Sequence, residues 1–429
     1  ASAARAHAPL LRALALAPDG SGQALALPGF GLLLQTRPDQ PYAYACDALL
    51  NATPRDTPPL LAYAHQNLIV GSLDGLRVLA ADGCPFVRAN DVLQTAPVLG
   101  LAVHAQTQTA YLVAAGRAEG IWRSDDAGQT WRTTGPLPNA AGVTALRVDP
   151  GAVDQLYISQ RQADGQVQLL VSRDGGASFE TVPQARAITL LHVESGASSL
   201  WAVARAADSV GNRGFELLRA EGPAQPWRAL LRVNYFGGLS FAPDGAIWVG
   251  DEGGGVYRSL DHGESFENLD NRNPAACIVA TDTATWTCAS TLPDMPSLRV
   301  RPAAGSAFEP SLAFKDVTQL VSCPAALDVE RTCQAAWIEW QRDILIRDMA
   351  AYDAGVPPPS AAEPAAAEPA AAGVTDAGAE HGAPAASACS VNHVGHAREH
   401  GLSVCCAIAC VMISRRGRAR RLAKLCDRA

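Results

Sequence analysis

The chain has 429 residues, and 48% of them are hydrophobic, which is enough to build a large core. Its net charge of −8 is unevenly spread: the last 16 residues carry seven basic and one acidic side chain, so the rest of the chain carries a charge of −14. Because nucleic-acid binding needs a basic surface, this acidic body excludes a nucleic acid as the expected partner.

Short strands are predicted from about residue 10 onward, beginning with Leu10–Ala17, Gln23–Pro28, Gly31–Thr36 and Tyr42–Cys46. An aromatic residue that opens the fourth strand recurs at intervals of 39 to 48 residues; these markers are Tyr42, Phe86, Trp131, Phe179, Trp227, Phe266 and Phe308. Such intervals are typical of propeller blades. We therefore expect an all-β protein whose residues 1–313 form a monomeric, seven-bladed β-propeller of four-stranded blades.

Three turns share the eight-residue pattern S-x-D-x-G-x-[ST]-[WF], over residues 124–131, 172–179 and 259–266. The residues that define the pattern are Ser124, Asp126, Gly128 and Trp131; Ser172, Asp174, Gly176 and Phe179; and Ser259, Asp261, Gly263 and Phe266. Short polar side chains can bond the backbone of their own turn, and glycine adopts a backbone angle that other residues resist. We expect these residues to hold the turn between the third and fourth strands, with the closing aromatic buried, and not to be catalytic or metal-binding.

The longest predicted loop between strands of one blade runs over Arg205–Gly214, and the next blade begins soon after it. Propellers bind partners on the faces formed by such loops and around the central axis. The sequence therefore suggests one candidate binding patch, made of Arg205, Asp208, Asn212, Arg213 and Tyr235.

Six of the eleven cysteines lie in the body as locally spaced couples, and none has the CxxC spacing typical of zinc or thioredoxin-type sites. Disulfides formed in an oxidising compartment are the better interpretation. We expect the pairs Cys277–Cys288, Cys323–Cys333 and Cys46–Cys84. The start without Met, on small residues, fits cleavage of a signal peptide. Both features predict an exported protein of the cell envelope, cell surface or extracellular space.

The repeat breaks after the seventh marker. Residues 314–349 are expected to form a disulfide-bounded cap whose short helix contains Trp337 and Trp340. Residues 350–388 are rich in Ala, Pro and Glu and are predicted to be a disordered linker. Residues 389–429 begin with Cys389, followed by a thirteen-residue apolar run over 401–413 and an arginine cluster. That run is shorter than a membrane span needs, and the Cys and His residues nearby fit no standard zinc finger.

Several stretches resemble a group of myxobacterial surface propellers with Asp-box repeats, also called bacterial neuraminidase repeats. They are Phe30–Leu34, Tyr44–Asp47, Asp82–Phe86, Leu200–Val203, Thr285–Cys288 and Cys323–Trp337. The last segment of the chain is similar to C-terminal sorting signals, which implies a membrane tether at that end. The wider superfamily includes sialidases, sortilin-like receptors and photosystem II assembly factors, so the resemblance does not decide the activity.

A sialidase of this superfamily would need three arginines around the substrate carboxylate, and only Arg12 and Arg147 lie on the predicted innermost strands. Asp251 and Glu252, which precede three glycines, are the best pair of carboxylates for another hydrolase, although a solvated, flexible turn is the simpler interpretation. We therefore expect no catalytic residues, cofactor or metal. The predicted function is a binding or structural module for an envelope protein or glycan, and the alternative is a sialidase-class glycoside hydrolase.

Overall fold

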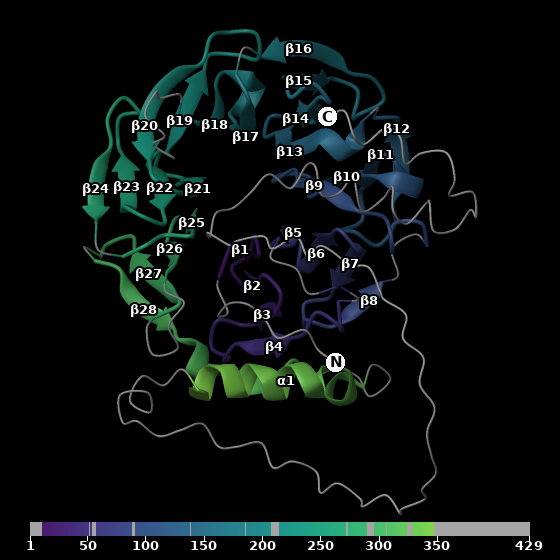
Figure 1. Cartoon of the computed structure of the whole chain (residues 1–429), viewed down its shortest axis with the longest axis vertical. Helices are drawn as coiled ribbons and strands as arrows, with labels where there is room; N and C mark the ends of the chain where they lie inside the picture. Colours follow the sequence, from purple (N-terminus) through teal and green to yellow (C-terminus); the bar gives the residue numbers. More distant parts are fainter. Residues whose placement is uncertain are drawn as a thin grey trace, which may run out of the picture. The chain divides into compact units, whose positions relative to one another are not determined.

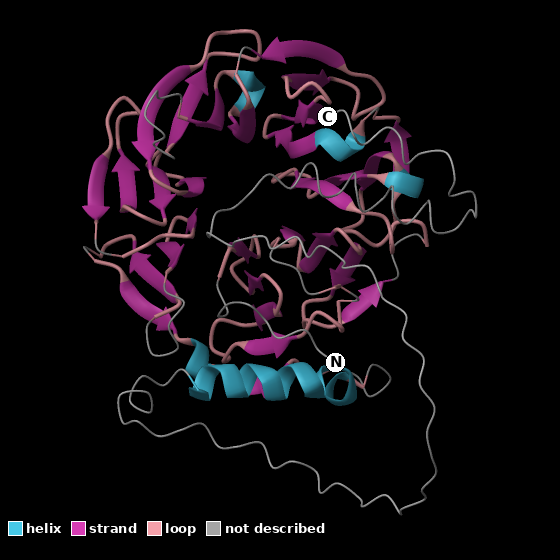
Figure 2. Ribbon diagram, viewed as in Figure 1, coloured by secondary structure: helices cyan, strands magenta, loops and turns pink. Residues whose placement is uncertain are grey.

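The computed structural model describes residues 11–346 except 51, 54–56, 88–90, 138, 185, 207–213, 272, 290–295, 306 and 324–327. Over these residues the chain forms seven blades, each an antiparallel set of four strands built from consecutive sequence, arranged around a common centre (Figures 1 and 2). The protein is thus a seven-bladed β-propeller, as the sequence predicts.

Blades one to four contain β1 (Ala13–Leu16), β2 (Gln23–Leu27), β3 (Gly31–Gln35) and β4 (Ala43–Ala45); β5 (Leu60–Ala64), β6 (Asn67–Ser72), β7 (Gly75–Leu79) and β8 (Pro85–Val87); β9 (Val98–Val103), β10 (Ala110–Ala114), β11 (Gly120–Ser124) and β12 (Arg132–Gly135); and β13 (Val143–Asp149), β14 (Ala152–Arg161), β15 (Val167–Ser172) and β16 (Glu180–Gln184). Blades five to seven contain β17 (Ile188–Val193), β18 (Leu200–Arg205), β19 (Phe215–Ala220) and β20 (Arg228–Val233); β21 (Phe236–Phe241), β22 (Ile247–Asp251), β23 (Gly255–Ser259) and β24 (Glu267–Asp270); and β25 (Cys277–Ala280), β26 (Ala284–Cys288), β27 (Leu298–Pro302) and β28 (Glu309–Leu312). A two-residue strand, β29 (Gln319–Leu320), and an 18-residue helix, α1 (Val329–Ile346), follow the seventh blade.

Burial changes from strand to strand across a blade. The first strand of each blade lies nearest the centre (Figure 1), and every residue of β1 and β21 is half-buried there. The second strand is packed on both faces by neighbouring blades, so β10 (AYLVA) is buried at all five positions. Near-continuous apolar runs mark such strands because neither face meets water.

The three patterned turns are held by the same set of hydrogen bonds. In the first, the Ser124 hydroxyl donates to Asp126 Oδ1 (2.8 Å) and accepts the Gly128 N–H (2.8 Å), while the Asp126 carboxylate accepts from the Thr130 N–H (2.8 Å) and hydroxyl (2.6 Å). The turns at 172–179 and 259–266 repeat these contacts. Gly128 has a φ of +84°, in the region that favours glycine.

The closing aromatics differ in burial. Trp131 is 7% exposed, and its indole N–H donates to the Gly128 carbonyl (2.9 Å). Phe179 and Phe266 are only half-buried, so the expectation of burial is confirmed for Trp131 and wrong for the two phenylalanines. A phenyl ring has no N–H that could bond the turn as the Trp131 indole does.

We predict that Asp126→Ala lowers the free energy of unfolding by about 1–3 kcal/mol, because the Thr130 N–H and the Ser124 hydroxyl lose their acceptor. Urea unfolding of the isolated variant measures this loss. Asp244→Ala, in a turn where the carboxylate accepts the Ala246 N–H (3.0 Å) and no other donor of the described residues, is the control and should lose less. Equal losses would contradict the role assigned to the turn network.

The segment after blade seven returns to the outer edge of blade one. There β29 pairs in parallel with β4, so the first sheet has five strands. Two disulfides secure this return: Cys46–Cys333 and Cys84–Cys323, each with a Cα–Cα separation of 5.6 Å. The expected pairs Cys46–Cys84 and Cys323–Cys333 are therefore wrong, because ring closure places the C-terminal segment against blades one and two. The expected Cys277–Cys288 bond is present.

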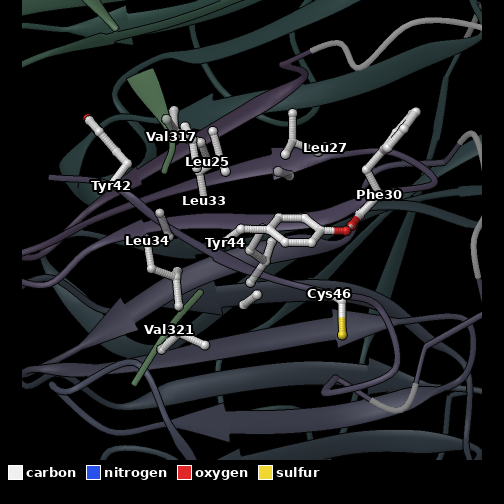
Figure 3. Close-up of a cluster of buried hydrophobic side chains, with 14 of the residues drawn as sticks. Leu25, Leu27, Phe30, Leu33, Leu34, Tyr42, Tyr44, Cys46, Val317 and Val321 are labelled. Carbon is white, nitrogen blue, oxygen red and sulfur yellow. Dashed lines mark hydrogen bonds between the residues drawn. The ribbon is translucent and has the colours of Figure 1, made fainter. Parts of the chain in front are cut away.

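Helix α1 lies along the outside of blade one, next to β4 (Figure 1). Trp340 is fully buried and packs edge-on to Phe30 and Phe314, while its ring stacks on Tyr44 at a centroid distance of 5.2 Å. Figure 3 shows the Tyr44 hydroxyl directed at Phe30, whose carbonyl accepts its hydrogen bond. The helix thus extends the core of the first blade outward and does not cover an end of the propeller.

The expected linker (350–388) and tail (389–429) lie outside the described residues. Within the described part of the chain, no helix has both the length and the apolar character needed to cross a bilayer.

Candidate functional site

Strand order places one set of loops on one face of the propeller. Neighbouring strands in a blade are antiparallel, so the turn between the second and third strands lies at the same end as the link to the next blade. We call this end the mouth face; the patterned turns lie at the opposite end. Arg12, Arg205, Tyr235 and Glu252 all belong to mouth-face ends or turns.

Two of the five candidate binding residues lie on the mouth face, Arg205 at the end of β18 in blade five and Tyr235 at the start of blade six. Arg205 pairs with Phe215, which pairs with Val233, two residues before Tyr235. Arg205 is exposed, and its guanidinium lies 5.8 Å from the centre of the Phe215 ring. Asp208, Asn212 and Arg213 lie outside the described residues. The structure therefore places Arg205 and Tyr235 on the same face, two strands apart, and leaves the middle of the loop as a prediction.

Tyr235 has an exposed side chain on a fixed backbone. It is 47% exposed, yet its N–H donates to Asp251 Oδ1 (2.9 Å) and its carbonyl accepts the Glu252 N–H (2.9 Å). A tyrosine presented in this way offers an apolar face and a hydroxyl at little cost in conformational entropy.

Asp251 is the anchor of this arrangement. It is 1% exposed, and its carboxylate accepts the backbone N–H groups of Asn234 (3.0 Å), Tyr235 (2.9 Å) and Gly253 (2.8 Å). A Cβ on Gly254 would lie 2.5 Å from Asp251 Oδ2, so the turn tolerates only glycine there. The expectation of a solvated, flexible turn at Asp251 is therefore wrong, because this carboxylate is buried and saturated by amides.

Glu252, the next residue, forms an ion pair with Arg12 across 240 positions of sequence. Arg12 precedes β1 of blade one and Glu252 follows β22 of blade six, so the pair spans the start of blade seven. The two side chains are 32% and 28% exposed. Burial raises the pKa of Glu252, and the charge of Arg12 opposes that rise. The sequence singled out Arg12 and Glu252 for separate reasons. Nothing near either residue in the chain could have predicted that they form an ion pair.

The second inner-strand arginine lies elsewhere. Arg147 is near the opposite end of β13, where it donates to the carbonyls of Leu191 (2.5 Å) and Leu146 (2.7 Å), and burial lowers its pKa to about 10. Beside it, His192 stacks on Phe241 with ring centres 4.0 Å apart, and burial lowers its pKa to about 4. Arg12 and Arg147 therefore lie at opposite ends of the innermost strands and do not belong to one cluster that could bind a substrate carboxylate.

A cavity of about 160 Å³ also opens on the mouth face, lined by blades one and two and by the start of β9 in blade three. Its walls are mainly apolar and include Leu27, Leu50, Pro58, Pro59 and Val98. It lies beside the long link that joins blades one and two. The mouth face therefore combines an apolar hollow at one side with the Tyr235 turn and the Arg12–Glu252 pair at the other.

Solved structures with the same fold include two hydrolases. An ancestral GH74 enzyme has a TM-score of 0.53 at 11% identity, over 70% of this chain and 46% of that chain. A puromycin-hydrolysing peptidase from Mycobacterium tuberculosis has a TM-score of 0.52 at 13% identity, over 73% of this chain and 54% of that chain. The chain thus spans about half of each, and at this identity the likeness shows the fold alone.

A smaller propeller, YCF48 from Cyanidioschyzon merolae, has a TM-score of 0.47 at 12% identity, over 67% of this chain and 94% of that chain. In sequence, no family model and no curated protein matches the chain.

Proposed function

We propose that this protein is a non-catalytic propeller that acts outside the cytoplasm and binds a protein or glycan of the cell envelope through its mouth face. The observation that carries the proposal is Tyr235, an exposed aromatic on a backbone that Asp251 holds in place. The neighbouring Arg12–Glu252 pair adds charged groups that a polar ligand can bond. A preorganised aromatic flanked by polar groups is typical of a binding site.

Export and the family assignment belong to the same proposal. Three disulfides fit an oxidising compartment. The repeated Ser–Asp–Gly hydrogen bonds support the assignment of the three turns as Asp-boxes of a sialidase-like propeller related to the myxobacterial group. Tethering through residues 389–429 rests on the sequence pattern of that segment alone.

The alternative is a glycoside hydrolase, and one observation favours it: the pKa of Glu252 is raised, as a general acid requires. Such an enzyme also needs a second carboxylate across the scissile bond. Asp251 is adjacent, but its oxygens are occupied by three amide donors, and Glu252 itself is held by Arg12. These contacts support the binding module over the hydrolase.

We predict that Tyr235→Ala weakens binding of the full chain to purified envelope glycan by roughly tenfold or more, because exposed aromatic anchors carry much of the energy of such contacts. Surface plasmon resonance on immobilised glycan measures the loss. Leu260→Ala is the matched control, since Leu260 is 69% exposed on the same blade but in the turn at the opposite face. Tyr235→Phe keeps the ring and removes the hydroxyl, so it measures how much of the binding energy each part contributes.

Equal binding by Tyr235→Ala and Leu260→Ala would overturn the mouth-face proposal. Turnover of a fluorogenic sialoside or glucan by the wild-type chain, abolished in Glu252→Gln, would establish the hydrolase instead. Both assays use the same purified protein, so the two functions are separated directly.

A further inference from the structure

Two arginines from neighbouring blades lie over one buried indole. Trp248 in β22 is 4% exposed, and the guanidinium carbons of Arg258 and Arg301 lie 5.7 and 5.3 Å from the centre of its ring. Arg258 faces Trp248 directly across the β22–β23 pair, whereas Arg301 reaches it from β27 in blade seven. We call Arg258 and Arg301 the arginine pair.

In blade three an arginine also lies over an aromatic ring, but there carboxylates balance the charge of the arginine. Arg123 faces Tyr111 across a strand pair and lies 5.5 Å from its ring centre. It forms ion pairs with Asp125 (2.7 Å) and with Asp154 of the next blade (2.5 Å). Two carboxylates therefore neutralise one guanidinium.

Blade five repeats this balance. Arg219 faces Trp201 and lies 5.5 Å from its ring centre. It lies 3.2 Å from Glu221 and 4.0 Å from Glu264, which belongs to the β23–β24 turn of blade six. In both blades, one balancing carboxylate thus comes from the next blade around the ring.

Blade six lacks this balance. Arg258 lies 3.4 Å from Glu267, whose side chain is 66% exposed. The turn of blade seven that matches the Glu264 turn, residues 302–308, contains no acidic residue. Asp282, in the β25–β26 turn that corresponds to the position of Asp154, forms no ion pair with either arginine within the described part of the chain. Among the residues described, the Arg301 side chain forms neither an ion pair nor a hydrogen bond. The Nε atoms of Arg258 and Arg301 are buried without an acceptor. Burial, and then the charge of Arg258, lower the pKa of Arg301.

We propose that the arginine pair binds an oxyanion, such as a sulfate, phosphate or carboxylate group, at the seam between blades six and seven. Two guanidiniums offer forked donors that match oxyanion geometry, and an anion would offset the repulsion between the two like charges at Trp248. The Arg258 side chain is 22% exposed, so solvent reaches the site. Both arginines lie at the ends of strands opposite the mouth face, so this site is separate from the proposed ligand face.

Isothermal titration of the wild-type protein with sodium sulfate, sodium phosphate and sodium acetate, each against sodium chloride of equal ionic strength, tests the proposal. At least one oxyanion is expected to bind, and the ranking among the three identifies its class. Arg301→Gln should raise the apparent Kd roughly tenfold or more, because it removes a charged donor. Arg219→Gln is the matched control and should keep the wild-type affinity.

Thermal unfolding in chloride adds a second readout. Arg301→Gln is expected to unfold at the wild-type temperature or above, since it removes an unbalanced cation, whereas Arg219→Gln should unfold lower because two carboxylates lose their partner. Arg301→Lys keeps the charge but loses the forked guanidinium donors, so it should bind the oxyanion more weakly than wild type. It replaces Arg301→Gln in the test if the Gln variant does not fold. No oxyanion binding beyond chloride, or equal affinity in Arg301→Gln and Arg219→Gln, would overturn the proposal.

Discussion

The double variant Cys46→Ser/Cys333→Ser is expected to lose about 4 kcal/mol of unfolding free energy, because, with Cys84–Cys323 still in place, the bond it removes closes a further loop of roughly 50 residues. In the chain-entropy view, a longer closed loop restricts the unfolded state more strongly. Spread over a propeller of this size, the loss corresponds to a fall in Tm on the order of 5–8 °C. Differential scanning calorimetry under non-reducing conditions measures it.

The control is Cys277→Ser/Cys288→Ser, which opens a disulfide between directly opposed residues of one hairpin, 11 positions apart. Its expected loss is about 2–3 kcal/mol, since the loop is short. A hairpin bond worth as much as the ring-closing bond would refute the view that closure between the first blade and the C-terminal segment stabilises the propeller.

Trp340→Ala is expected to lower the free energy of unfolding by about 3–5 kcal/mol, as truncation of a fully buried aromatic removes apolar burial and leaves a cavity. The loss should be accompanied by release of α1 from blade one, because this indole contacts Phe30, Tyr44 and Phe314 together. Urea unfolding gives the energy, and far-UV circular dichroism gives the helix content.

Ile338→Ala provides the comparison on the same helix, because Ile338 is 57% exposed. A surface change of this kind is expected to stay within about 0.5 kcal/mol of wild type. If Trp340→Ala were equally mild, the helix would contribute nothing to the first blade, and its packing there would have to be explained otherwise.

Local features of this fold were predictable because their determinants lie close together in the chain. The β1–β4 strands fall within the ranges expected for them, and the 124–131 turn forms its bonds between residues two to four positions apart. Cys277–Cys288 was found for the same reason. Because the strand pattern of one blade repeats along the chain, a correct prediction for one blade also predicts the other six.

Contacts that depend on ring closure were not predictable. Pairing cysteines by nearness in sequence fails when the last segment packs on the first blade, as Cys46–Cys333 shows. The same holds for Arg12–Glu252, which meets only after six further blades are in place. Tyr235 was chosen for its place at the start of a blade, but the saturation of Asp251 by three amides required knowledge of turn geometry that the residues alone do not supply.

The Cys46–Cys333 bond also determines how the molecule bears mechanical load. A pulling force applied beyond α1 reaches Cys333 and passes through the sulfur bridge into blade one, without peeling blade seven from the ring. All residues between Cys46 and Cys333 lie inside a covalent loop and cannot be stretched end to end while the bridge is intact. Under tension only the first four strands and the helix can extend, so most of the propeller stays folded at forces that unravel its ends.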